Sequence, residues 1–260
     1  MENITTMLNR ISFLHGFLAL SILWVVLALL LEKPPVEVPD FDKFASVQEK
    51  KASFFEFFGK LVEEENKRIE GLREELKNHP NQQRLEKHAK RYRVDISDPA
   101  TDQDIARLLK KIDVLPASLV LSQAAIESAW GTSRFAKEGF NFFGQWCFSK
   151  GCGMVPAARD KGASHEVRVF DSPRDAVRAY FRNLNSHPTY KKLRDLRETA
   201  RSQNTPIHGC ILAAGLSSYS ERGQHYIDEI KQMIRVNDLT PYSEAPCAAS
   251  VKRKQVADAG

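Results

Sequence analysis

The sequence predicts a mainly α-helical protein with one small β-hairpin, preceded by a transmembrane helix and a long charged helix. Three observations predict this class. Residues 11–31 form an apolar run, residues 46–78 carry apolar side chains at heptad spacing among many charges, and most segments beyond residue 80 have helical periodicity. Only residues 164–170 alternate in the manner of a strand.

The N-terminal run reads ISFLHGFLALSILWVVLALLL, which is about the ~20 apolar residues that a membrane-spanning helix needs. It ends in Leu-Glu-Lys-Pro-Pro without a small-residue cleavage site, so we expect an uncleaved anchor over residues 11–31 after a cytoplasmic stub, residues 1–10. A long signal peptide cut at an unusual place is the alternative. Residues 32–45 are then a proline-rich linker.

Residues 46–95 are predicted to be a charged helical segment that packs on the body of the protein. Its first helix, about residues 46–78, carries an apolar residue at every seventh position: Phe55, Val62, Ile69 and Leu76. Such a seam packs along the body or against a partner helix, and the sequence leaves both open. A second, basic helix is expected over about residues 81–93.

The body, residues 96–240, opens with two predicted helices. The first starts near Asp102, with acidic residues in its first turn. Pro116 opens the second, which we expect to extend to Ala129 and to stop before Gly131.

A short hairpin is predicted next, between residues 143–148 and residues 164–170, with the loop that holds Cys152 at its tip. Helix starts follow at Ser172-Pro173 and at Thr205-Pro206, where a capping hydroxyl precedes a proline. A final helix is expected from about Gln224 to Val236, and residues 241–260 are predicted to be a flexible tail.

The charge balance is mildly basic, with 38 Lys and Arg against 33 Asp and Glu. Such a balance suits an anionic polymer or surface. No DNA- or RNA-binding motif accompanies it, so we expect no nucleic-acid partner.

Cys147 and Cys152 flank a short glycine-containing loop that could close into a disulfide ring, and such a ring would imply an oxidising compartment. Two buried thiols are the alternative. A zinc site is not favoured, because the spacing is not C-x2-C and no paired histidines accompany it. The sequence does not decide whether Cys210 and Cys247 are bridged.

One stretch identifies a family. QAAIESAWGTSRFA (123–136) followed by NFFG (141–144) resembles the signature of glycoside hydrolase family 73, the β-N-acetylglucosaminidases. Four further stretches, GQWCFSKGCGMVP, HEVRVFDSP, NLNSHPTYKKLR and YSERGQHY, are similar to the Bax-like branch of that family. The resemblance covers about residues 45–240. It implies a lysozyme-like helical fold, a groove for the glycan strands of peptidoglycan, and hydrolysis of the β-1,4 bond that follows N-acetylglucosamine. No cofactor or metal is expected.

The resemblance assigns the catalytic acid to Glu127. Glycoside cleavage needs a protonated carboxyl at the leaving oxygen near neutral pH. A carboxyl at the C-terminal end of a helix, set against Ile126 and Trp130, loses solvent and lies near the negative pole of the helix, and both effects raise its pKa. The alternative is a solvated surface glutamate.

The second catalytic group is open. In the family a glutamate on the hairpin activates water, and Glu166 matches it best by position, although a solvent-facing strand residue is the alternative. A different mechanism uses the 2-acetamido oxygen of the substrate as the nucleophile and needs no second carboxylate. The family's catalytic tyrosine, part of a Y-x5-Y pattern, is carried to Tyr219, although Tyr219 and Tyr226 here have six residues between them.

We expect five further residues to contribute to substrate binding: Trp130, Asn141, Phe143, Trp146 and Tyr226. Asn141 and Phe143 belong to the N-x-F-G turn. Trp146 stands where the family often has lysine, and it could either stack on a sugar ring or pack in the core. Trp130 is expected to form the apolar wall around Glu127, with a sugar platform as the alternative.

Two other functions compete with glucosaminidase activity. One is a lytic transglycosylase or muramidase of the same superfold, whose typical E-S-x-F-N-P and G-x-x-G-L-M-Q motifs are absent. The other is a non-catalytic glycan-binding scaffold. A peptidoglycan substrate favours a single-pass inner-membrane protein with its catalytic domain in the periplasm. The lysines that follow residues 11–31 favour the opposite orientation, because Lys and Arg are enriched on the cytoplasmic side of a membrane helix.

Overall fold

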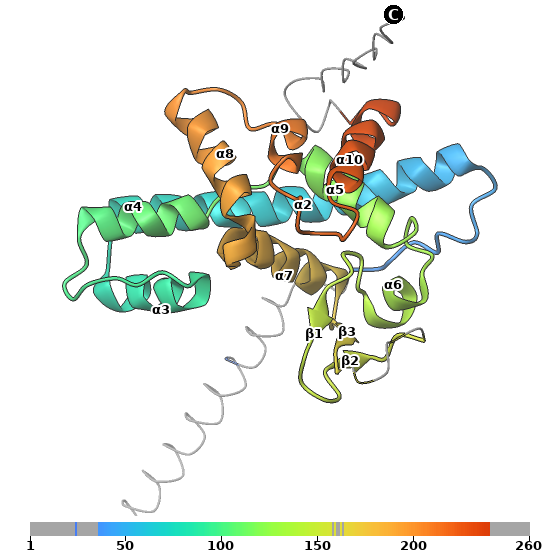
Figure 1. The fold of residues 1–260 in the computed structure, drawn as a ribbon, viewed down its shortest axis with the longest axis horizontal. Helices are drawn as coiled ribbons and strands as arrows, with labels where there is room; N and C mark the ends of the chain where they lie inside the picture. The colour runs from blue at the N-terminus through green and yellow to red at the C-terminus, as the bar shows by residue number, and fades with distance from the viewer. Residues whose placement is uncertain (1–23, 25–35, 158, 160–161, 163, 240–260) are drawn as a thin grey trace, which may run out of the picture. The chain divides into compact units, whose positions relative to one another are not determined.

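The computed structural model describes residues 24, 36–157, 159, 162 and 164–239 (Figure 1). The chain divides into two compact units, Met1–Glu37 and Val38–Gly260, and helices α2 to α10 belong to the second. The predicted anchor, Trp24 apart, and the predicted tail with Cys247 lie outside the described residues. Within the described part of the chain, no helix is long and apolar enough to cross a membrane.

Helix α2 (Val47–Asn78) is the predicted charged helix and forms the support of the body. Ser46 and Glu49 close a capping box at its start, each side chain accepting the backbone N–H of the other. The helix contacts α4 (Asp102–Lys111), α5 (Ala117–Glu127) and α7 (Pro173–Ser186). All four seam residues are buried: Phe55, Val62, Ile69 and Leu76. The seam therefore packs along the chain's own body, the first of the two expected arrangements.

The basic helix α3 (Gln82–Tyr92) also forms as predicted and lies against α4 and α7. Asn81 caps its start by accepting the N–H of Arg84, and Arg93 ends it in a left-handed conformation with φ of 57°. This ending directs the chain back toward α4, whose own start is capped by Thr101 and Asp104.

Helix α5 ends at Glu127, earlier than the predicted Ala129. Ala129, Trp130 and Gly131 all have positive φ, 51°, 60° and 77°, so the chain leaves the helix in a tight left-handed turn. The Ser128 hydroxyl fastens this turn by donating to the Ala124 carbonyl at 2.6 Å and accepting the Gly131 N–H at 2.8 Å. Glu127 consequently stands at the last helical position.

The predicted hairpin is present but is part of a three-stranded sheet. Strand β1 (Trp146–Cys147) pairs antiparallel with β3 (Glu166–Arg168), with Trp146 opposite Val167. Strand β2 (Gly153–Met154) adds to the other edge of β3, in the order β1-β3-β2. The backbones approach so closely there that a Cβ on Gly153 would lie 2.1 Å from the Val167 carbonyl oxygen. The loop between the expected strands thus contributes a strand of its own.

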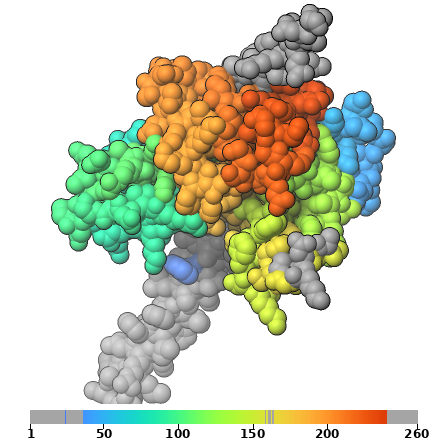
Figure 2. Space-filling model, viewed as in Figure 1, coloured from blue at the N-terminus to red at the C-terminus, as the bar shows by residue number. Residues whose placement is uncertain are grey.

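The C-terminal half is helical. After the short α6 (Arg134–Gly139), helix α7 starts at the predicted cap Ser172, and the last helix, α10 (Gln224–Val236), has its predicted bounds. Between them lie η1 (Pro188–Tyr190), α8 (Lys191–Ser202) and α9 (Gly209–Ala213). Figure 2 shows the orange-to-red surface of these later helices covering the middle of one face, beside the green surface of α3 and α4.

The prediction that a helix starts at Thr205-Pro206 is wrong, because α9 begins only at Gly209. The Thr205 hydroxyl donates back to the Ala200 carbonyl at 3.2 Å and so closes the end of α8 instead of opening a new helix.

A buried ionic cluster joins α2, α8 and the segment before α5. Asp113 is 2% exposed and pairs with Arg73 at 3.6 Å, with Arg197 at 3.4 Å and with Arg201. Burial opposes ionisation of Asp113, but the three guanidinium groups outweigh it and hold its pKa below the usual value. The carboxylate is therefore the common counter-charge of three arginines.

Replacing this carboxylate should destabilise the fold strongly. Asp113→Asn leaves buried guanidinium groups without a counter-charge, so the free energy of unfolding should fall by about 3–5 kcal/mol. Urea denaturation followed by circular dichroism measures it. Glu56→Gln, which breaks an exposed pair with Lys60 at 2.7 Å, is the control and should change stability little. A loss from Asp113→Asn no larger than the control's would contradict the role assigned to the cluster.

Candidate active site

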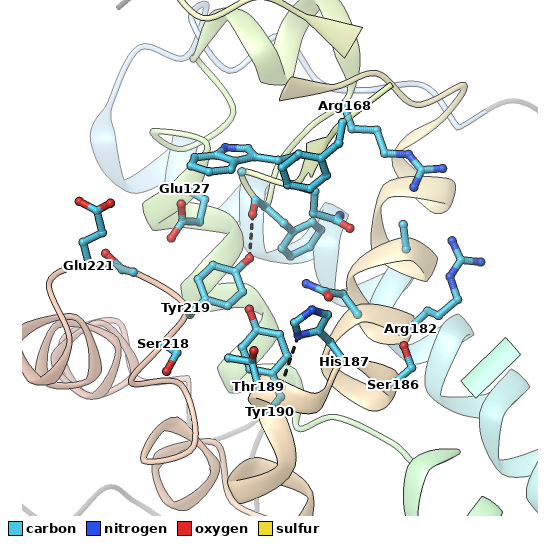
Figure 3. Close-up of a pocket in the computed structure, with 18 of the residues that line it drawn as sticks. Glu127, Arg168, Arg182, Ser186, His187, Thr189, Tyr190, Ser218, Tyr219 and Glu221 are labelled. Carbon is cyan, nitrogen blue, oxygen red and sulfur yellow. Dashed lines mark hydrogen bonds between the residues drawn. The ribbon is translucent and has the colours of Figure 1, made fainter. Parts of the chain in front are cut away.

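A groove of about 1010 Å³ runs between the end of α5, the turn at residues 143–148, α7 and the loop before α10. Figure 3 shows its lining, with Glu127 and Tyr219 on one side and Arg168 and Arg182 on the other. Four of the residues that the sequence predicted for the site line it: Glu127, Phe143, Trp146 and Tyr219. Gly144 of the N-x-F-G turn lines it as well.

Glu127 is half-buried at the C-terminal end of α5. Its Oε1 accepts a hydrogen bond from the Tyr226 hydroxyl at 2.6 Å. Its Oε2 lies beside Gly144, where a Cβ would approach to 3.0 Å, and the φ of +61° at Gly144 also disfavours any other residue. Gly144 thus leaves the second carboxyl oxygen room at the groove.

The pKa of Glu127 is raised. Burial is the largest cause, and it outweighs the opposing hydrogen bond from Tyr226 and the positive charge of Arg222, while the negative charge of Glu229 raises the pKa further. The carboxyl therefore holds its proton to a higher pH than an exposed glutamate, as a general acid requires.

Tyr226 belongs to a chain of buried hydrogen bonds that leads to Glu127. The Tyr180 hydroxyl donates to Oε1 of Gln123 at 2.5 Å, Nε2 of Gln123 donates to the Tyr226 hydroxyl at 2.9 Å, and Tyr226 donates to Glu127. Because the Tyr226 proton is committed to Oε1, a proton on the Glu127 carboxyl belongs on Oε2.

Sequence reasoning missed Gln123 and Tyr180 as members of this site. A signal for Gln123 existed, because it stands one helical turn before Glu127 within QAAIES and therefore shares its face. Tyr180 gave no such signal, since its position beside Gln123 depends on how α7 packs on α5.

The sequence assigned the catalytic tyrosine to Tyr219, but Tyr226 is the tyrosine that contacts Glu127. Their rings stack in parallel with centroids 5.6 Å apart. The Tyr219 hydroxyl donates to the Phe143 carbonyl at 2.7 Å, as the dashed line in Figure 3 marks, whereas Tyr226 contacts Glu127. Tyr226 is fully buried behind the acid and is not a groove-lining residue, which differs from its expected place at the substrate.

Glu166, the expected base, is placed differently from the expectation. Its side chain is buried, and its carboxylate accepts the backbone N–H of Gly151 at 3.0 Å and of Gly153 at 2.8 Å. These bonds lower its pKa. Glu166 is not among the groove-lining residues, and its carboxylate organises the loop between β1 and β2.

The predicted disulfide between Cys147 and Cys152 is confirmed and closes this same loop. Their sulfurs lie within 4.8 Å of a carboxylate oxygen of Glu166. The three residues resemble a metal-ligand set only by proximity, because sulfurs bonded to each other are not thiolate ligands.

Two aromatic residues form much of the groove wall near Glu127. Phe143 is buried and stacks on Tyr180 with centroids 4.2 Å apart. Trp146 is 55% exposed and stacks on His165 with centroids 4.2 Å apart, so one face of a fixed indole is open to solvent. Of the two positions that the sequence left open between sugar stacking and core packing, Trp146 has the exposure that stacking on a sugar needs.

Asn141 and Trp130 shape the site without lining it. The buried Asn141 amide donates to the carbonyls of Gln145 and Arg168 at 2.8 and 2.7 Å and so ties the N-x-F-G turn to β3. Trp130 packs edge-on against Phe54 and Phe55, with centroids 5.5 and 5.2 Å away, on the side of α2. Neither residue lines the groove, although both were expected to contact the substrate.

Comparison with known proteins shows the family of the chain. Residues 102–239 match the glucosaminidase family, described as mannosyl-glycoprotein endo-beta-N-acetylglucosaminidase. The chain is 31% identical over 208 residues to Protein bax of Escherichia coli (strain K12). The aligned region covers 77% of this chain and 74% of that protein. No solved structure matches the chain.

The hydrogen bond from Tyr226 has a measurable effect on the acid. Tyr226→Phe removes an interaction that favours the carboxylate, so the pKa of Glu127 should rise above its wild-type value. A pH titration of the glutamate side-chain carbons by NMR measures it. Tyr219→Phe removes the hydroxyl that contacts Phe143 and should leave the Glu127 pKa nearly unchanged. An unchanged or lower pKa in Tyr226→Phe would refute the assignment.

Proposed function

The chain belongs to the glucosaminidase family, and on that premise we propose that it hydrolyses peptidoglycan at the β-1,4 bond that follows N-acetylglucosamine, with Glu127 as general acid. One observation carries the proposal. A half-buried carboxyl with a raised pKa has one oxygen held by Tyr226 and the other beside Gly144 at the groove. A glycosidic oxygen bound there would meet the acid's proton.

We favour a mechanism in which the substrate's own acetamido group is the nucleophile. Oε2 of Glu127 gives its proton to the bridging oxygen, the C1–O bond breaks with its electrons going to that oxygen, and the acetamido oxygen bonds to C1. Water then attacks C1, the acetamido oxygen leaves, and the water proton returns to Glu127. This mechanism is supported by the position of Glu166, the expected base, whose carboxylate already accepts the backbone N–H groups of Gly151 and Gly153.

Glu221 is the competing base. It is the other carboxylate among the described groove-lining residues, and it follows Tyr219 where the family pattern has an aspartate. As a base it would activate water on the far side of the sugar and invert the anomeric centre. Glu221 is exposed and no described residue forms an ion pair with it, so its carboxylate is less well positioned than that of Glu127.

We propose that the protein is anchored in the inner membrane by residues 11–31, with its catalytic domain in the periplasm. The apolar run supports the anchor, and the Cys147–Cys152 disulfide supports an oxidising compartment. A peptidoglycan substrate requires the same location.

Glu127→Gln should preserve the fold and reduce hydrolysis of purified sacculi by at least ~10²-fold, because an amide of nearly the same size cannot donate the proton. Release of soluble fragments measures the rate, and mass spectrometry identifies the ends. Reducing N-acetylglucosamine ends from the wild type support the proposal. Anhydro-muramic ends would indicate a transglycosylase, and no product from the wild type would indicate a scaffold.

Glu138→Gln is the matched control for that variant. Glu138 is an exposed glutamate on α6 outside the groove, so its substitution should leave the rate of hydrolysis unchanged. If Glu127→Gln keeps more than a tenth of the wild-type rate, Glu127 is not the acid.

The two mechanisms predict different behaviour of Glu221→Ala. If the acetamido group is the nucleophile, Glu221→Ala should lose little activity, and a thiazoline analogue of N-acetylglucosamine should inhibit strongly. If Glu221 is the base, the variant should lose most activity, and added azide should restore turnover and give a glycosyl azide of inverted configuration. Glu166→Ala should not respond to azide, since its carboxylate is buried in the disulfide loop.

A further inference from the structure

The groove has a second chemical feature that hydrolysis by Glu127 does not use. Five arginines line it. One of them, Arg222, forms an ion pair with Glu229 at 2.7 Å, and the other four are Arg91, Arg93, Arg168 and Arg182. They come from three separate elements, with Arg91 and Arg93 at the C-terminal end of α3, Arg168 on β3 and Arg182 on α7. Figure 3 shows Arg168 and Arg182 across the pocket from Glu127.

These four arginines differ from the arginines that stabilise the fold. Arg73, Arg197 and Arg201 share Asp113. None of the four groove arginines forms an ion pair with a carboxylate in the described residues. The interaction of Arg168 is with an aromatic ring, its guanidinium lying 5.0 Å from the centroid of Phe170.

Three of the four groups, Arg91, Arg168 and Arg182, are also close enough for their charges to interact. The pKa of Arg182 is lowered by burial first and then by the positive charges of Arg91 and Arg168. Like charges held together without an anion repel one another and destabilise the folded protein. A bound anion would relieve that repulsion, and neutral donors stand nearby, since Ser186 and His187 line the same part of the groove.

We propose that these four arginines form an anion subsite that binds carboxylates of the peptidoglycan strand while the scissile bond lies at Glu127. This rests on the proposed function and narrows its substrate. A glycan of N-acetylated sugars is neutral, so the negative charge of the polymer comes from its stem peptides or from the lactyl group of muramic acid where no peptide is attached. Guanidinium groups bind carboxylates in a bidentate geometry that lysine cannot reproduce.

Half of this subsite lies outside the matched family region. Arg91 and Arg93 precede residue 102, where the match begins. Helix α3 contacts α7, so it brings these two side chains to the groove that also holds Arg182. The N-terminal helices therefore extend the groove with positive charge in addition to supporting the body.

Binding tests the subsite independently of hydrolysis. The double variant Arg91→Gln/Arg93→Gln changes two exposed residues and should fold normally, and Lys87→Gln/Lys90→Gln is its matched control. The control removes the same charge from exposed positions of the same helix that do not line the groove. Both are made in the Glu127→Gln background, so that the ligand stays intact.

Fluorescence anisotropy then gives Kd for three soluble labelled ligands: glycan strands with stem peptides, amidase-treated strands that carry only lactyl carboxylates, and a neutral chitin oligosaccharide. The double variant should bind the peptide-bearing strands at least about tenfold more weakly, the effect of losing one charge-assisted hydrogen bond. It should bind the chitin oligosaccharide as the parent does. The lysine control should bind all three as the parent does.

The remaining outcomes identify the anion or overturn the proposal. A loss on amidase-treated strands as well assigns the subsite to lactyl carboxylates, and a loss on peptide-bearing strands alone assigns it to the stem peptide. Equal losses on neutral chitin, or the same loss in the lysine control, would overturn the subsite. If the wild type hydrolyses nothing while charge-dependent binding persists, the proposed hydrolysis fails and the subsite stands.

Discussion

The hydrogen bond from the Tyr226 hydroxyl to Oε1 of Glu127 is the contact on which the site depends. It joins the end of α5 to α10 through two residues that are 99 positions apart in the chain, at a distance of 2.6 Å. Gln123 and Tyr180 extend the contact to α7. Three helices must therefore pack correctly before the acid is oriented, and α2 supplies the apolar surface on which two of them, α5 and α7, lie.

Opposing effects act on this one carboxyl. Burial raises its pKa, whereas the donor at Oε1 and the charge of Arg222 lower it. A fully apolar pocket would hold the proton too firmly to release it, and a glutamate on an open surface would already be ionised near neutral pH. The buried hydrogen bonds that end at Tyr226 lower the pKa that burial raises. They also place the acid's proton on Oε2, because Oε1 already accepts a hydrogen bond.

Much of the fold could be predicted because its signals are local. Capping residues and heptad spacing located α2, α3, α4, α7 and α10, and the E-S-x-W-G motif located Glu127. The positions that differed depend on tertiary structure. Nothing local marks Ala129 and Trp130 for positive φ, and the side chain of Trp130 has its place because Phe54 and Phe55 lie beside it. Glu166 was expected to be the base or a solvent-facing strand residue, whereas its actual place depends on the fold of the disulfide-closed loop, which brings Gly151 and Gly153 to its carboxylate.

The placement of Glu166 has a consequence for how the groove is built. A carboxylate that accepts two backbone N–H groups inside a closed ring stiffens the loop from which Phe148 reaches the groove. Trp146 directly precedes the disulfide-closed loop and stacks on His165, the residue before β3. The small sheet therefore acts as a rigid wall facing the helices, and its charge at the groove comes from Arg168 while Glu166 is withdrawn. Had Glu166 pointed into the groove, it would have paired with the arginines and neutralised them. Its burial leaves their positive charge available to a ligand, so the loop that removes the expected base from the groove also preserves the positive charge across from Glu127.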